Sequence, residues 1–246
     1  MTTQSSSSPS APSFLREAQL TWQHRTTTEY RSSQILTRFL SESLAASDPA
    51  EVHAVILDLI ADELEHVRLC ESVCRDLGVT PTRPSKLELN DPVQFTQAPA
   101  RERALHTAIT MMLINETVSV GFIQDLEARC QTPSIKRVLT ATLGDESAHE
   151  QFGYDYVKRG LAHYGPIALN DFRHLVALAL APHEGGARRA LQNVPEEKCT
   201  LEAWPDTQRI SLGLFSPERQ ALVYQRTYRE VLAPKLLALG LIAATS

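Results

Sequence analysis

Apolar side chains recur every three or four residues over most of the chain, which is the period of a helix with one buried face. Four long segments carry this pattern, at about residues 15–46, 49–77, 102–130 and 133–164. No convincing alternating pattern of a β-strand occurs before residue 165. The sequence therefore predicts an all-α protein.

Residues typical of helix ends mark the borders of these segments. Asp48 and Thr132 are good N-cap residues, and each precedes a proline, which suits the first position of a helix. Glu51 can complete a capping box with Asp48. Gly78 suits the C-cap of the second helix, and Gly165 with the proline after it ends the fourth.

The connections between the helices predict their topology. Few residues separate the first helix from the second, or the third from the fourth, which favours two antiparallel hairpins. The connector between the hairpins spans residues 78–101. At up to ~3.3 Å per residue, it can run back along a helix ~39 Å long. We therefore expect a four-helix bundle with one long crossover between helices 2 and 3.

The two ends of the chain differ from this central part. Residues 1–13 contain no charged side chain and no apolar run, which predicts a disordered tail. Residues 14–165 are predicted to form the bundle. Residues 166–246 hold too little apolar surface for a core of their own, so we expect a helical C-terminal extension packed on the bundle.

Two helices are predicted within this extension. One surrounds residues 172–180, and the other begins at Ser216 and runs to about Leu239. Pro234 is expected to kink the second helix. Pro182 and the Gly185-Gly186 pair are expected to break the region between the two helices.

Six polar residues occupy the apolar stripes of the four main helices. Each hairpin presents a glutamate followed by an E-x-x-H motif, whose Glu and His share one helix face. The first glutamate precedes the motif by 34 residues in one hairpin and by 30 in the other, which can bring all six side chains to one level. Buried carboxylates are costly unless paired or metal-bound. These residues are Glu29, Glu63, His66, Glu116, Glu146 and His149.

With this repeated pattern over residues 15–164, the chain resembles the ferritin-like superfamily of carboxylate-bridged dimetal proteins. The resemblance implies two metal ions held by the six residues. It also implies that Glu63 and either Glu116 or Glu146 bridge the ions, and that each histidine binds one of them. The remaining glutamates would be terminal ligands.

Carboxylates and imidazoles suit iron and manganese, so a di-iron centre is expected, with Mn/Fe as the alternative. Zinc is disfavoured because neither motif has the leading histidine of H-E-x-x-H. Asp62 and Asp145 each precede a motif glutamate. Each is predicted either to accept a hydrogen bond from the other helix's histidine or to be a solvated flank residue. Glu65 and Glu150 are predicted to be surface charges.

The composition narrows the range of partners. A formal net charge of −5 disfavours nucleic acid, and no apolar run is long enough to predict a membrane span. Cytoplasmic localisation is the resulting expectation. None of the four cysteines forms a C-x-x-C pair, which leaves no signal for a rubredoxin-type iron site. Cys70 and Cys74 are expected to be buried thiols, with a redox role near the metals as the alternative.

The leading functional hypothesis is a non-haem di-iron oxidase or oxygenase that activates O2 on a small organic substrate. The extension of about 80 residues could roof a substrate pocket. The alternative is a ferroxidase or iron-binding ferritin-like protein. A rubrerythrin-like peroxidase, an RNA-modifying hydroxylase and a metal-free structural bundle are further alternatives. An electron-donor reductase is a candidate partner, and we expect a monomer or small homo-oligomer, in particular a dimer.

Overall fold

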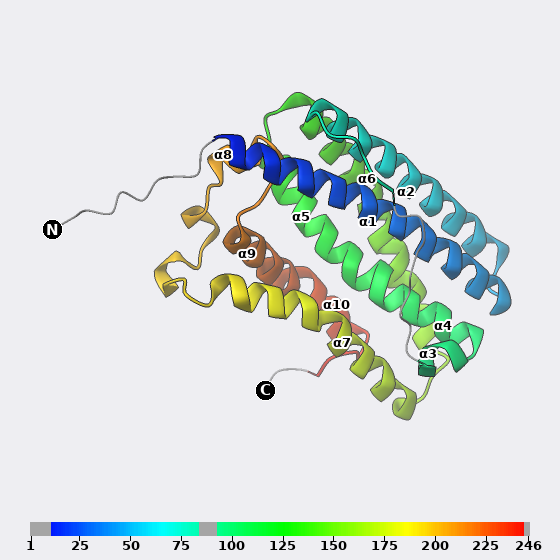
Figure 1. Ribbon diagram of the computed structural model, residues 1–246. Helices are drawn as coiled ribbons and strands as arrows, with labels where there is room; N and C mark the ends of the chain where they lie inside the picture. The colour runs from blue at the N-terminus through cyan, green and yellow to red at the C-terminus, as the bar shows by residue number, and fades with distance from the viewer. Residues whose placement is uncertain (1–10, 84–92, 244–246) are drawn as a thin grey trace.

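The computed structural model describes residues 11–83 and 93–243 (Figure 1). Within these ranges the chain is all-helical and has no strand, as predicted. Residues 1–10 of the predicted tail and 84–92 of the predicted connector lie outside the described residues. The elements are α1 (Ala11–Ala45), α2 (Ala50–Asp76), α3 (Val93–Gln97), α4 (Ala100–Thr107), the π-helical segment η1 (Ala108–Asn115), α5 (Glu116–Arg129), α6 (Pro133–Leu161), α7 (Pro166–Leu191), the 3₁₀ turns η2 (Glu196–Lys198) and η3 (Leu201–Ala203), α8 (Thr207–Ile210), α9 (Pro217–Thr227), the π-helical segment η4 (Tyr228–Leu232) and α10 (Ala233–Ala238).

The long helices lie side by side and follow the predicted order of connections (Figure 1). The end of α2 meets the start of α1, where Gln19 Nε2 donates to the Leu77 carbonyl oxygen at 2.9 Å. The start of α4 meets the other end of α1, where Arg101 Nη2 donates to the Ala46 carbonyl oxygen at 3.2 Å. Leu77 and Arg101 thus lie at opposite ends of α1, which is compatible with the predicted crossover.

The third long helix contains a feature that the hydrophobic pattern did not predict. Its path is continuous from α4 to α5, but η1 between them has π-helical hydrogen bonding. A π-helical turn holds an extra residue, so it rotates the faces that follow relative to a regular helix. Leu105, Ile109, Met112 and Glu116 are buried as expected, whereas Val120 is only half-buried beyond η1.

Two details at the helix ends differ from the predictions. Helix α1 already begins at Ala11, rather than near residue 15. Helix α2 begins at Ala50, and the Asp48 side chain does not cap it. Instead, the Asp48 carboxylate accepts hydrogen bonds from Ser43 at 2.9 Å and from the Tyr156 hydroxyl at 2.6 Å. Tertiary partners therefore replace the expected local cap.

The predicted break after residue 180 is wrong. Helix α7 continues through Pro182 and both glycines to Leu191. Pro182 is exposed, so the backbone carbonyl that loses its hydrogen bond there can face solvent, while Phe172 and Ala187 are buried on either side of it. Packing of the buried face of α7 against η1 and α9 overrides the weak local propensity.

The last helical region is interrupted as expected near Pro234. Ser216 caps α9, because its Oγ accepts a hydrogen bond from the Arg219 amide at 3.2 Å. Segment η4 widens the helix immediately before Pro234, which has no N–H for an α-helical bond. Helices α7 and α9 pack on each other, and α9 also packs on α5. The C-terminal region thereby covers one side of the long helices.

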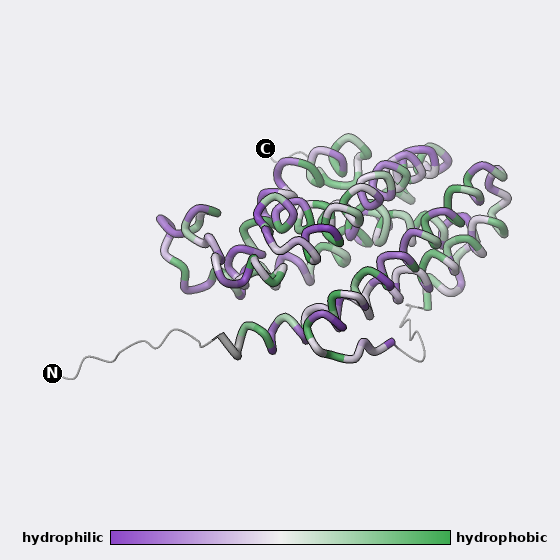
Figure 2. The backbone as a smooth tube through the Cα atoms, turned by 90° about the horizontal axis from the view of Figure 1, so that it is seen from above, coloured by the Kyte–Doolittle hydropathy of each residue, from purple (hydrophilic) through white to green (hydrophobic). Residues whose placement is uncertain are grey.

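Hydrophobic and hydrophilic residues are interspersed along the helices (Figure 2). Buried side chains form two clusters, one around Met112 and Phe39 and the other around Trp22 and Leu139. Among the described residues, no helix combines the length and apolar character needed to cross a membrane.

A close helix contact between α6 and η1 gives a first testable prediction. A Cβ atom added to Gly153 would lie 2.5 Å from the Met112 Cβ and 2.6 Å from its backbone. Gly153→Ala should therefore lower the free energy of unfolding by about 1–3 kcal/mol through overpacking. Gly144→Ala, in the same helix but with nothing within 4 Å, should raise it by about 0.5–1 kcal/mol. Urea denaturation of both variants measures the contrast, and equal effects would contradict it.

Candidate metal centre

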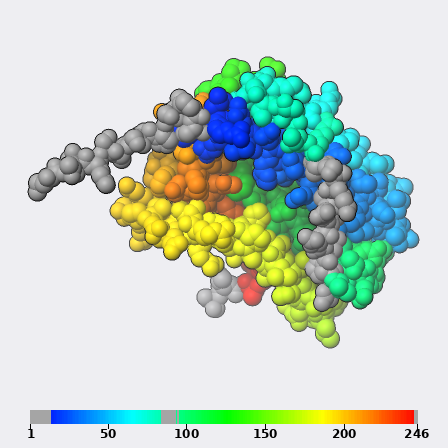
Figure 3. Space-filling view, in the orientation of Figure 1, coloured from blue at the N-terminus to red at the C-terminus, as the bar shows by residue number. Residues whose placement is uncertain are grey.

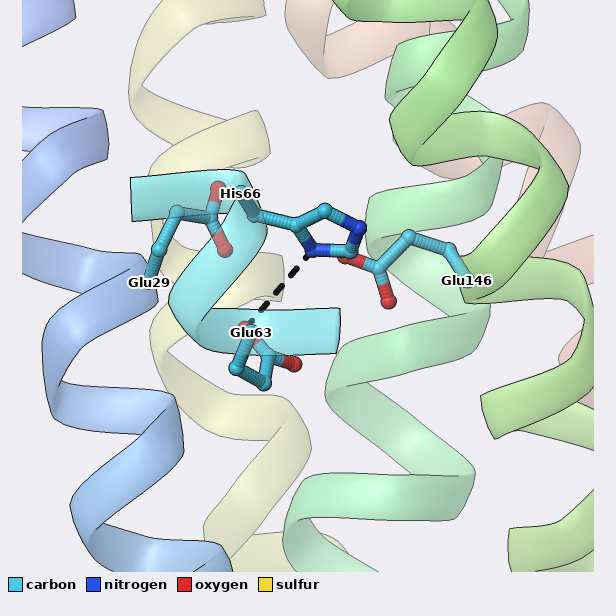
Figure 4. A group of neighbouring side chains, drawn as sticks. All are labelled: Glu29, Glu63, His66 and Glu146. Atoms are coloured by element: carbon cyan, nitrogen blue, oxygen red, sulfur yellow. Dashed lines mark ion pairs between the residues drawn. The ribbon is translucent and has the colours of Figure 1, made fainter. Parts of the chain in front are cut away.

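The structure brings all six predicted residues together in the interior of the long helices. Glu29 comes from α1 and Glu116 from the first residue of α5. The E-x-x-H motif at Glu63 lies mid-way along α2, and that at Glu146 mid-way along α6. Figure 4 shows four of the side chains pointing toward one another from three helices. Five of the six are at most 3% exposed, and Glu29 is half-buried.

The six residues form two overlapping groups of potential metal ligands. In each group, the donor atoms lie within 4.8 Å of one another. Glu63 and Glu146 belong to both groups, and each carboxylate reaches toward both histidines. The first group is Glu29, Glu63, His66 and Glu146, and the second is Glu63, Glu116, Glu146 and His149.

The distances show how the shared carboxylates lie between the two imidazoles. His66 Nδ1 lies 3.9 Å from Glu63 Oε2 and 3.6 Å from Glu146 Oε1. His149 Nδ1 lies 3.6 Å from Glu63 Oε1 and 3.3 Å from Glu146 Oε2. Each carboxylate thus presents one oxygen to each histidine. Glu63 and Glu146 could therefore be shared between two metal positions, with Glu29 in one ligand group and Glu116 in the other.

The inward-facing atoms of this cluster lack partners of their own. Within the described residues, five buried side-chain atoms of the cluster form no hydrogen bond. A buried polar atom without a partner costs roughly 1–3 kcal/mol, and five such atoms in one place are typical of a site that binds a ligand. The donor types, four carboxylates and two imidazoles, fit a pair of divalent ions. These atoms are Glu63 Oε2, His66 Nδ1, Glu116 Oε1, Glu146 Oε2 and His149 Nδ1.

The outer nitrogens of both histidines do have partners, and they are the predicted ones. His66 Nε2 lies 3.1 Å from Asp145 Oδ2, and His149 Nε2 lies 3.3 Å from Asp62 Oδ2. Each aspartate therefore reaches across to the histidine of the opposite motif. An acceptor at Nε2 keeps the proton there and leaves Nδ1 facing the cluster as the metal-binding atom.

Burial and crowded charge perturb the titration of the cluster. Burial would lower the pKa of His66, but Glu63 and Glu146 outweigh it and raise that pKa to about 9. The same two carboxylates raise the pKa of His149 to about 10 against the effect of burial. Burial, reinforced by neighbouring carboxylates, raises the pKa of Glu29 and Glu116 well above their usual range. Without metal, protons thus occupy positions that metal ions would take.

The π-helical segment η1 ends directly before Glu116. Its wider turn sets the rotation at which the Glu116 carboxylate enters the cluster. Segments of this kind often occur at functional sites because they change the direction of a side chain without ending the helix. Nothing in the hydrophobic period of residues 108–115 distinguishes this segment from a regular helix, so sequence reasoning missed it.

A cavity of about 570 Å³ adjoins the cluster, and Glu29 is the member of the six that lines it. Its walls come from α1, α5, α6 and the stretch that enters α9, and they include Leu139, Phe122 and Phe215. Figure 3 shows residues of α5 between the blue residues of α1 and the yellow residues of α7. The C-terminal region supplies part of the cavity wall, including Phe215 and Gln220.

Of the small or polar residues that flank the motifs, Ser119 and Thr142 line this cavity. Ser33 and Gly153 instead serve helix packing. The Ser33 hydroxyl donates to the Tyr30 carbonyl oxygen at 2.8 Å, and Gly153 lies against Met112.

Several other polar residues have structural roles outside the cluster. Glu42 is buried, accepts a hydrogen bond from Thr107 at 3.1 Å and is not in either ligand group. The prediction that Glu150 is a surface charge is wrong. It accepts a hydrogen bond from Thr117 at 2.6 Å and pairs with Lys235 at 2.9 Å, thereby joining α6 to α5 and α10.

The expected thiol burial is confirmed. Cys70 and Cys74 are at most 3% exposed, and both are free. Cys70 lines the cavity beside Glu29. Burial raises the pKa of the Cys70 thiol well above its usual range, and Glu29 adds to this effect. The protonated thiol therefore acts as an apolar wall residue.

No family model matches the chain, and neither a curated protein nor a solved structure shows a significant similarity to it.

Proposed function

We propose that the chain is a ferritin-like, carboxylate-bridged dimetal protein that holds two iron ions, with Mn/Fe as the alternative pair. The proposal is supported by two overlapping ligand groups that share Glu63 and Glu146 and by the unpartnered donor atoms that face inward. The antiparallel hairpins with one crossover fit the same family of bundles. Four carboxylates with two neutral imidazoles balance the charge of two divalent ions.

We further propose that the centre belongs to an O2-dependent oxidase or monooxygenase that acts on a small organic substrate. When bound, a pair of iron ions supplies the electrons that O2 reduction requires. The cavity beside Glu29 carries this proposal, because its size lies within the ~300–1,000 Å³ typical of small-molecule pockets. Its largely apolar wall suits an organic molecule better than a hydrated ion. Asp62 and Asp145 orient the histidines, and an external reductase would return the centre to its reduced state.

Oxygen consumption by the Fe(II)-loaded protein tests this function. With an electron donor and a library of small organic molecules, an oxygenase or oxidase should consume O2 in proportion to substrate and yield an oxidised product detectable by mass spectrometry. A ferroxidase would instead oxidise many Fe(II) ions per chain without any organic substrate. Ferric mineral inside a large shell, detected by light scattering, would favour that alternative and overturn the enzyme proposal.

Metal content gives the next prediction. Protein purified from iron- and manganese-replete medium, or loaded anaerobically with Fe(II), should contain about two transition-metal ions per chain. The reason is that the two ligand groups share only two residues, so each group can hold an ion of its own. Iron should dominate. Elemental analysis measures the ratio. One zinc ion per chain, or no retained metal after Fe(II) loading, would contradict the dimetal centre.

A further inference from the structure

The wall of the cavity beside Glu29 includes the positively charged side chain of Arg25. Arg25 lies one helical turn before Glu29 on α1. Its Nη2 donates to the Gly213 carbonyl oxygen at 3.0 Å, and its guanidinium carbon lies 4.5 Å from the centroid of the Trp22 ring. Nη1 is buried and forms no hydrogen bond with any described residue.

The other charged groups of the cavity do not neutralise this guanidinium. Glu17 pairs with Arg209 at 3.2 Å, and neither Glu17 nor Glu29 forms an ion pair with Arg25. Arg25 is the one arginine or lysine among the described residues that line the cavity. Arg25 is half-buried, and Glu29, one turn along α1, is the carboxyl group of the cavity that acts on its charge without an ion-pair contact. Burial lowers the pKa of Arg25, but arginine keeps its proton in proteins, so the positive charge remains.

We propose that the cavity binds a small organic monocarboxylate, whose carboxylate pairs with Arg25 and whose apolar body lies against the cavity wall next to Glu29. This inference rests on the proposed function and specifies its substrate class. Trp22 stacks on the guanidinium and Gly213 accepts from Nη2, so the plane of the guanidinium is already fixed. The carboxylate supplies an opposite charge on the cavity side of this guanidinium.

The surroundings of Arg25 favour a monoanion over a dianion such as a phosphate. Phosphate sites normally combine several cationic or amide donors. Here a single guanidinium lies close to the carboxyl group of Glu29, and the other cavity walls around it are largely apolar, for example Leu126 and Val138. One negative charge on an apolar body therefore matches the chemistry of the cavity.

Binding of a charged probe and its neutral counterpart tests the proposal. We suggest 4-phenylbutyrate and 4-phenylbutanamide, which share shape but differ in charge. The full chain, with and without Fe(II), is titrated with each by calorimetry under anaerobic conditions. The acid should bind at least about tenfold more tightly than the amide, equivalent to ~1.4 kcal/mol. Arg25→Gln should abolish this preference, while Arg31→Gln, an exposed position on the same helix, should leave it unchanged.

Each outcome separates this inference from the proposed function. Metal content of Arg25→Gln should equal that of the unmodified protein, since Arg25 is not in either ligand group. Arg25→Lys retains the charge and should keep part of the preference, which covers the case in which Arg25→Gln does not fold. A preference for the acid that survives Arg25→Gln, or that requires metal, would mean that the carboxylate binds the metals, and the proposal would be overturned. Equal or undetectable binding of both probes would also overturn it. Loss of the dimetal centre alone would leave the acid preference of the metal-free protein intact.

Discussion

Replacing Glu63 or Glu146 with alanine is expected to abolish metal binding and any reaction with O2. Both carboxylates belong to both ligand groups, so either change removes a donor from each metal position. Metal bound only to the native state stabilises it by about 2.7 kcal/mol at one hundred times the dissociation constant. The unmodified protein should therefore melt at a higher temperature with Fe(II) than without it, and neither variant should show this rise.

Without metal, the glutamate variants should keep their stability, and variants of neighbouring core leucines should lose it. Loss of one carboxylate relieves repulsion among buried acids, so Glu63→Ala and Glu146→Ala should change the metal-free melting temperature little or raise it. Leu59→Ala and Leu139→Ala, on the same helix faces and each 4% exposed, should cost about 2–5 kcal/mol and keep the metal-induced rise. Thermal melting with and without Fe(II) measures all four variants. If the two glutamate variants keep the rise, these residues are not ligands.

Asp125→Ala is expected to destabilise the fold by about 3–5 kcal/mol, because it leaves a buried guanidinium without its counter-ion. Asp125 is 6% exposed on α5 and accepts two hydrogen bonds from Arg219 of α9, at 2.9 and 2.8 Å. Arg129 donates to the same carboxylate at 2.7 Å. Arg219 also donates to the Leu201 carbonyl oxygen at 2.6 Å, so this pair connects the C-terminal region to the long helices.

The pH dependence of this effect has a defined sign. Burial alone would raise the pKa of Asp125, but the hydrogen bonds and charges of Arg219 and Arg129 outweigh it and lower the pKa. A lowered pKa in the folded state gives stability that is present above the unfolded-state pKa and is lost as the pH falls through the folded-state pKa. Urea denaturation should therefore show a smaller difference between the unmodified protein and Asp125→Ala in acid than at neutral pH.

A surface acid on the same helix provides the control for this prediction. Glu127 pairs with Lys136 at 3.6 Å and is about a quarter exposed. Glu127→Ala should cost no more than about 1 kcal/mol, because solvent screens an ion pair of this kind. An Asp125→Ala effect as small as that of Glu127→Ala would show that the Arg219 contact does not connect the two parts of the chain.

The sequence alone determined the helical class and the six residues of the cluster. These features are encoded locally: the helical period places Glu63 and His66 on one face, and similar spacings in the two hairpins bring the motifs to one level. For Asp62 and Asp145 the sequence left two alternatives, and the structure shows the one in which each aspartate contacts the histidine of the opposite motif.

Only the tertiary structure decided the features that depend on packing between distant segments. The course of α7 through Pro182 contradicts the local sequence signal, and the π-helical turn before Glu116 has no local signal at all. In both places, neighbouring helices compensate for the altered hydrogen bonding. The cavity beside Glu29 combines walls from α1, α5, α6 and the C-terminal region, and no single stretch of sequence encodes it. The surroundings of Arg25 also depend on distant segments, because Gly213 and Trp22 contact its guanidinium only in the folded chain.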